Sequence, residues 1–150
     1  MSTGRSALLG AAVLVCLLTV GGCVPLEQDV DATGTWTGTR VWQEGSLEGI
    51  STPLTLVLTQ EGRTVSGEVR VMAGQQAIPL PVIRGSVRGR GVLIEASGTP
   101  EIGGVPVAIT FSLQGDVNGN VMTGSGSETV AGGQNPFVFE VERPAPPPEE

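Results

Sequence analysis

The chain of 150 residues has no histidine, lysine or tyrosine, and it has only two cysteines, two tryptophans and three phenylalanines. The missing residue types supply most of the general bases and nucleophiles that enzymes use. Carboxylate pairs are left, but acids such as Glu68, Glu95 and Glu140 fall at positions that we expect to face solvent. We therefore expect a protein that is not an enzyme and that holds no cofactor.

Positive charge is also scarce. Residues 23–150 carry seven arginines and fifteen acids, which gives a net charge of −8. Proteins that bind nucleic acid need a clustered basic surface to displace phosphate counterions, so we exclude nucleic acid as a partner. An acidic body is not attracted to anionic headgroups either, and surface charge cannot hold this protein on a membrane.

The first 23 residues have the three-part layout of a secretory signal peptide. Residues 1–5 carry one cation, residues 6–20 are almost wholly apolar, and Val20-Gly21-Gly22-Cys23 follows. These last four residues resemble the lipobox of bacterial lipoproteins, although Val20 and Gly21 stand where Leu and Ala or Ser are commoner. The resemblance implies cleavage before Cys23, a diacylglycerol on its sulfur, and acylation of the new amino end, as with palmitate.

An uncleaved membrane anchor is the alternative, but residues 8–20 are shorter than the roughly 20 apolar residues that a bilayer requires. Two or more acyl chains would anchor the protein stably. Cleavage would also remove Cys16 and leave Cys23 as a lone thiol that acylation occupies. Position 24 is Val rather than the Asp that retains such lipoproteins in the inner membrane, so the resemblance implies the cell envelope, with the outer membrane favoured and the domain outside the cytoplasm.

Composition divides the chain into four segments. Residues 1–22 are the signal peptide, 23–32 a polar, acidic, lipidated tether, 33–143 one folded domain, and 144–150 a Pro-rich acidic tail. The tail favours an extended polyproline conformation, and docking to a proline-binding partner is the alternative to a plain tail.

The folded domain has the alternation of apolar and polar residues that is typical of β-strands. Leu54, Leu56 and Leu58 alternate with Thr55, Val57 and Thr59, and the large apolar residues of 105–113 alternate with smaller or polar ones. We predict an all-β fold of eight strands, over 34–43, 52–60, 64–72, 80–88, 91–97, 105–117, 120–128 and 136–143. Eight consecutive antiparallel strands can close into an up-and-down barrel, and a β-sandwich is the alternative fold.

Three two-residue loops predict the strand pairing, because the residues on either side of a tight turn face each other. Taking the turns as Glu61-Gly62, Gly89-Arg90 and Asn118-Gly119 predicts, among others, the pairs Leu58–Val65, Leu56–Gly67, Val87–Val92, Gly85–Ile94, Ile83–Ala96, Gly115–Met122 and Leu113–Gly124. Each hairpin then sets a large side chain opposite a glycine. This is how the narrow interior of a small barrel is filled.

The ends of the domain resemble the calycins, the group of lipocalin-like and avidin-like barrels. Gly34-Thr35-Trp36 opens the first strand and Arg143 ends the last. In calycins a Gly-x-Trp on strand one packs beneath an arginine of the final strand, a cation–π contact that is favourable by about 1 kcal/mol. The tyrosines of lipocalin and biotin-binding sites have no counterpart in this chain, so the resemblance implies no ligand-binding residue.

Two charges are predicted to point into the barrel. Parity places Arg40 on the face of Trp36 and Trp42, and the third hairpin turns Glu128 inward as well. Buried charges are costly unless they are paired. Either Arg40 pairs with an acid such as Glu128, or it lies near an open mouth and meets solvent or an anionic ligand.

No metal site is predicted. Asp116-Val117-Asn118-Gly119-Asn120 opens like a calcium loop, but Val121 and Ser127 stand where that loop needs Gly and Glu. An Asn-Gly hairpin explains the segment without a metal.

Two functions follow from these observations. The barrel can hold a small hydrophobic ligand, with Trp36, Arg40, Trp42, Glu128 and Arg143 as candidate lining or interior residues. Alternatively it is a filled structural or interaction module whose loops, 44–51, 73–79 and 98–104, contact an envelope protein. In both cases the protein is also attached to the membrane, through the lipid at its N-terminus.

Overall fold

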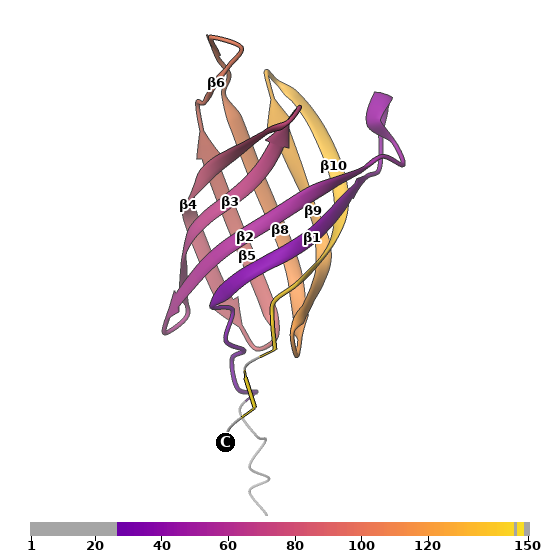
Figure 1. The fold of residues 1–150 in the computed structure, drawn as a ribbon. Coiled ribbons are helices and arrows are strands. Elements are labelled where there is room, and N and C mark those ends of the chain that lie inside the picture. Colours follow the sequence, from indigo (N-terminus) through magenta and orange to yellow (C-terminus); the bar gives the residue numbers. More distant parts are fainter. Residues whose placement is uncertain (1–26, 146, 149–150) are drawn as a thin grey trace, which may run out of the picture.

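The computed structural model describes residues 27–145 and 147–148, so the signal peptide, Cys23 and the acylation predicted for it lie outside the described residues. Eight strands form one closed antiparallel barrel in the order β1-β10-β9-β8-β5-β4-β3-β2, as predicted, and not a sandwich (Figure 1). The barrel strands are β1 (Gly34–Trp42), β2 (Ser51–Glu61), β3 (Thr64–Ala73), β4 (Gln76–Arg88), β5 (Gly91–Gly98), β8 (Ile109–Asn118), β9 (Val121–Val130) and β10 (Gly133–Glu142). Each strand pairs with its neighbours along the chain, which is the up-and-down topology of a lipocalin-like barrel.

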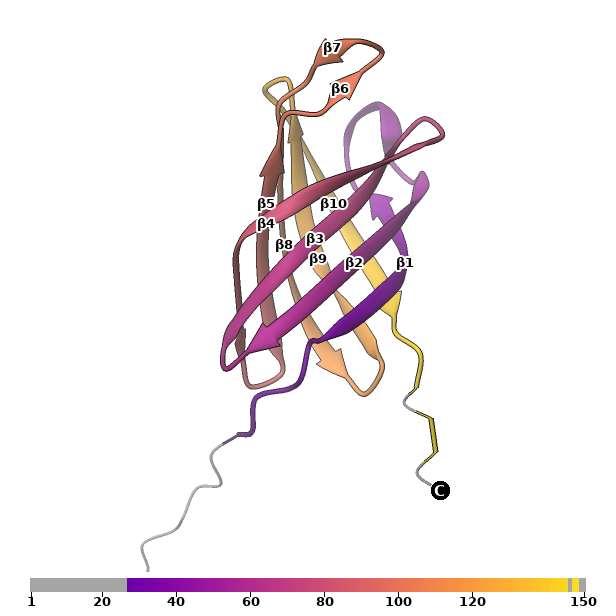
Figure 2. The ribbon, with the colours of Figure 1, turned by 60° about the vertical axis from the view of Figure 1, so that its left-hand side comes forward.

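The two ends of the barrel differ (Figures 1 and 2). At one end, the terminal end, the described N-terminal residues enter, residues 143–145 leave, and three tight turns close the strands. The opposite end, the loop end, carries a loop with the short 3-10 helix η1 (Gly45–Leu47) and a small hairpin of β6 (Glu101–Ile102) and β7 (Val105–Pro106). Within the described residues, no helix has the length and hydropathy needed to cross a bilayer.

Two predicted strand boundaries are wrong at the loop end. The predicted strand 105–117 begins only at Ile109, because Val105 and Pro106 pair back onto residues 101–102 in the separate hairpin. The predicted loop 73–79 is instead a tight turn, and β4 starts at Gln76. Gly74 has a φ of 63°, which lets two residues reverse the chain.

The registers of the first and third hairpins are wrong by two residues. The turns are Gly62-Arg63 and Gly119-Asn120, so that Leu58 faces Gly67, Leu113 faces Gly126 and Gly115 faces Gly124. In both turns the glycine takes the first central position with a positive φ, which is the arrangement of a type II′ turn. A shift of two residues leaves every side chain on its predicted face.

The second hairpin follows the prediction up to an irregularity in β4. Val87 faces Val92 and Gly85 faces Ile94, but Val82 rather than Ile83 lies opposite Ala96. The register shifts between Val82 and Arg84, and a bulge of this kind turns one side chain to the other face. Ile83 therefore projects outward, with 63% of its surface exposed.

Residues 29–32 are part of the folded body, which corrects the prediction that all of 23–32 is a tether. Ala32 is fully buried, and its N–H donates to Gln60 Oε1 over 2.7 Å. Val30 N donates to Gly89 O over 2.8 Å, and Asp29 accepts hydrogen bonds from Gly89 N and Arg63 Nε. These contacts hold the segment against the turns at Gly62-Arg63 and Gly89-Arg90.

Candidate functional site

Arg40 and Glu128 form an ion pair inside the loop end of the barrel. The Arg40 Nη2 atom lies 3.3 Å from Glu128 Oε2, and the two side chains are 2% and 9% exposed. Arg40 Nε also donates to Thr52 Oγ1 over 3.1 Å. The pairing is the first of the two arrangements that the sequence left open for Arg40.

Aromatic rings surround the Arg40 guanidinium. Its Cζ atom lies 4.2 Å from the Trp42 ring centroid, 5.2 Å from that of Phe137 and 5.9 Å from that of Phe111. Burial lowers the pKa of Arg40, while the Glu128 carboxylate partly offsets this effect. Among the described residues, Arg40 Nη1 and Trp42 Nε1 have no hydrogen-bond partner, so two donors point into the interior at this end.

Trp36 and Arg143 close the terminal end, with the contact that the calycin resemblance implies. Arg143 Cζ lies 4.4 Å from the Trp36 ring centroid, and Trp36 is fully buried. Trp36 Nε1 donates to Ala32 O, and Arg143 Nη1 donates to Asp31 O and Thr33 O, each over 2.7 Å. Arg143 therefore fastens the N-terminal segment across the barrel end and does not line an interior site.

Neighbouring side chains occupy the interior space that the inward glycines leave. A Cβ atom added at Gly115 would lie 2.8 Å from Phe139 Cζ, and one at Gly126 would lie 2.7 Å from Phe137 Cζ. Both distances are shorter than Cβ contacts in proteins, so the phenylalanine rings already lie against the backbone of β8 and β9. Large side chains of β10 thus occupy the space beside Gly115 and Gly126.

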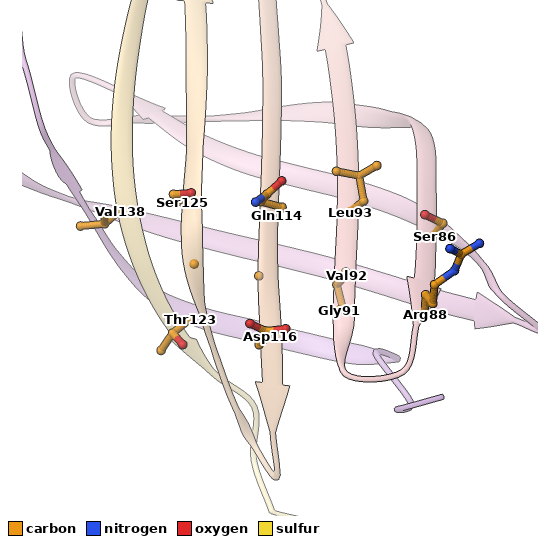
Figure 3. Close-up of a pocket in the computed structure, with 12 residues that line it drawn as sticks. Ser86, Arg88, Gly91, Val92, Leu93, Gln114, Asp116, Thr123, Ser125 and Val138 are labelled. Carbon is orange, nitrogen blue, oxygen red and sulfur yellow. The ribbon is translucent and has the colours of Figure 1, made fainter. Parts of the chain in front are cut away.

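A hollow of about 600 Å³ lies on the outer surface, over β4, β5, β8, β9 and β10 (Figure 3). One row of outward residues crosses it from strand to strand: Ser86, Leu93, Gln114, Ser125 and Val138. A second row, nearer the terminal end, holds Arg88, Gly91, Asp116 and Thr123.

The glycines explain why the barrel wall is hollowed at this place. Gly115 and Gly124 are paired partners that carry no inward side chain, so β8 and β9 lie close to the Phe139 ring below them. Gly91 adds space on the outer side because it has no side chain in the second row. The hollow therefore lies over a part of the wall where Gly91, Gly115 and Gly124 carry no side chain.

The residues predicted for the interior do not line the outer hollow. Trp36, Arg40, Trp42 and Glu128 lie inside the barrel, and Arg143 lies at the terminal end. The hollow was missed because outward Ser, Thr and Gln residues are ordinary on a solvated strand. Its sequence signal is the row of hydroxyl and amide side chains at the outward positions of β8 and β9, in which Asp116 is the one charged residue, beside glycines at neighbouring inward positions.

Asp116 lies on β8, in the outer hollow. The described residues hold no cluster of three or more metal-binding side chains of the His, Cys, Asp and Glu types.

No family model matches the chain, and neither the curated proteins nor the solved structures give a match. The chemistry of the chain's own residues therefore carries the functional argument.

Proposed function

We propose that this protein is a non-catalytic lipoprotein of the bacterial cell envelope, attached to the membrane through an acylated Cys23, whose filled barrel serves as an interaction module. Binding then takes place on the outer surface and the loops. The signal-like segment and the lone thiol of the mature chain support the anchor. The missing general bases and nucleophiles support a role without catalysis.

The observation that carries this proposal is the packing of Phe137 and Phe139 against the inward glycines of β8 and β9. A barrel that carries a small hydrophobic ligand needs an internal cavity, and eight strands leave room for one only when the inward side chains are small. Here the inward residues include Trp36, Trp42 and Phe111, all of them buried. The interaction module is therefore preferred over the hydrophobic-ligand carrier.

The anchor also gives the barrel an orientation. Residues 23–28 can span at most about 20 Å, because an extended chain covers roughly 3.4 Å per residue. Asp29 is bound to the terminal end through Gly89 and Arg63. The terminal end thus lies near the membrane, and the loop end with η1 and the β6–β7 hairpin points away from it.

Three measurements test the proposal. Titration of the detergent-solubilised protein with the neutral fluorophore N-phenyl-1-naphthylamine should give no saturable one-to-one binding, and native mass spectrometry should show no retained ligand. Saturable binding that Phe139→Ala strengthens would instead support a ligand-holding barrel. In fractionated cells the wild type should follow the membranes and Cys23→Ala should not, and a Cys23→Ala variant that stays with the membranes would contradict the lipid anchor.

A further inference from the structure

We propose that the outer hollow binds an uncharged oligosaccharide, a chain of neutral sugar residues. This inference rests on the proposed function and names the class of ligand that the outer surface recognises. The volume of about 600 Å³ is within the range of small-molecule sites in proteins.

The hollow offers hydrogen-bonding groups that the protein does not use. Ser86, Gln114 and Ser125 point outward, and all three are exposed (Figure 3). No side-chain hydrogen bond between described residues involves these three or Thr123. Hydroxyl and amide groups both donate and accept, which matches the alternating donors and acceptors of sugar hydroxyls.

Two apolar side chains stand beside these polar groups. Leu93 and Val138 lie in the same row as Gln114 and Ser125, and they are 41% and 43% exposed. A sugar ring presents C–H groups as well as hydroxyls, so one ligand can contact both kinds of side chain. A purely apolar ligand would leave the hydroxyls and the amide without partners, at a cost for each.

Charge selects a neutral ligand. The mature chain carries a net charge of −8, which repels acidic chains, and the hollow holds only one arginine, Arg88, against one acid, Asp116. A cationic partner would need an excess of carboxylates, which the hollow lacks. Neutral polyhydroxylated chains meet neither penalty.

A second hollow extends the first toward the loop end. It has about 360 Å³ and shares Leu93, Gln114 and Ser125 with the first hollow. Ser112 and Ser127 continue the hydroxyl surface there, with their Oγ atoms 3.3 Å apart. The shared lining makes one track along β8 and β9, which fits several linked sugar residues rather than one.

The test is a titration of the ¹⁵N-labelled, detergent-solubilised mature protein, followed by amide chemical shifts. The probes are chitotetraose, cellotetraose and maltotetraose, with the acidic tetragalacturonate as a fourth. We expect at least one neutral probe to shift the amides of Leu93, Gln114 and Ser125 saturably, with millimolar affinity, because no aromatic ring is among the lining residues. The tetragalacturonate should bind more weakly.

Gln114→Ala/Ser125→Ala removes two hydrogen-bonding groups and should weaken binding about tenfold, because each lost group leaves a sugar hydroxyl without its partner. The matched control, Thr37→Ala/Thr59→Ala, changes two exposed residues on β1 and β2 and should bind as the wild type does. Both variants should retain the dispersed spectrum of the folded barrel. Equal affinity in the two variants would overturn the site.

Other outcomes would overturn the ligand class. One is an absence of saturable shifts with all three neutral probes. A second is tighter binding of tetragalacturonate than of any neutral probe. A third is a shift of the same amides with protein concentration alone, which would mark a contact between two copies. Such results leave the proposed function standing if the apolar fluorophore still fails to bind. Uptake of the fluorophore into the barrel would instead contradict the proposed function itself.

Discussion

Replacement of Glu128 by glutamine tests the ion pair at the loop end of the barrel. The change removes the carboxylate that lies 3.3 Å from Arg40 and leaves a guanidinium that is 2% exposed. Removal of one partner from a buried pair costs about 3–5 kcal/mol, because the other charge stays buried without compensation. The glutamine amide oxygen can still accept a hydrogen bond from Arg40, as Thr52 Oγ1 does now. We therefore expect the free energy of unfolding to fall by about 3 kcal/mol, the lower end of that range.

The free energy of unfolding is measured with guanidinium chloride, followed by tryptophan fluorescence and far-ultraviolet circular dichroism. Glu140→Gln is the control, because Glu140 is an exposed acid on β10, and it should change stability by less than about 0.5 kcal/mol. The double variant Arg40→Met/Glu128→Leu should be more stable than either of its single variants, Arg40→Met and Glu128→Leu. A Glu128→Gln variant within about 1 kcal/mol of the wild type would refute this reasoning, and so would a double variant whose loss equals the sum of the single losses.

Three further predictions concern the barrel interior and its terminal end. Gly126→Ala should destabilise the protein by about 1–3 kcal/mol in chemical denaturation, because its Cβ would clash with the backbone oxygen of Ser112 and lie 2.7 Å from Phe137 Cζ. Gly133→Ala, whose Cβ would meet its nearest atom at 3.5 Å, should cost less, and equal losses would contradict the close packing at Gly126. Arg143→Met loses the contact with the Trp36 indole and two hydrogen bonds of 2.7 Å to the N-terminal segment. Hydrogen exchange should therefore accelerate at the amides of residues 30 and 32. Unchanged exchange rates would show that another contact holds this segment. The hydrogen bond from Arg63 and then that from Gly89 N hold the pKa of Asp29 below its ordinary value of 3.8, so its stabilisation is present above about pH 4 and is lost as pH falls through the folded-state pKa. Unfolding measured at about pH 5 and pH 3 should therefore show a smaller acid loss in Asp29→Asn than in the wild type, and an identical loss would rule out this contribution.

The fold and the inward faces followed from the sequence because alternation has a period of two. Leu54, Leu56 and Leu58 reach the core in any register that preserves parity, and a two-residue error in two hairpins moved none of them outward. The same reasoning placed Arg40 and Glu128 inside. The registers themselves depend on which of the two central positions of a turn takes a positive φ. From the sequence alone, Gly62 fits either of these positions.

Other features depend on contacts between distant residues. The predicted tether contains Ala32, whose burial requires Gln60 and Trp36 to lie beside it, and nothing in the polar composition of that segment indicates this. The outer hollow arises where two glycines on neighbouring strands meet a ring from a third strand. This arrangement depends on how three strands pack in the closed barrel. The sequence therefore predicted which residues face outward but not that they line one hollow.

The most direct test of the filled barrel is a high-resolution crystal structure of the mature protein purified from membranes. We expect the interior to contain side chains alone, with at most isolated waters at Arg40 Nη1 and Trp42 Nε1, the two buried donors without protein partners. Continuous elongated density between Phe111 and Leu56, with Phe137 and Phe139 displaced from the glycines, would contradict the account.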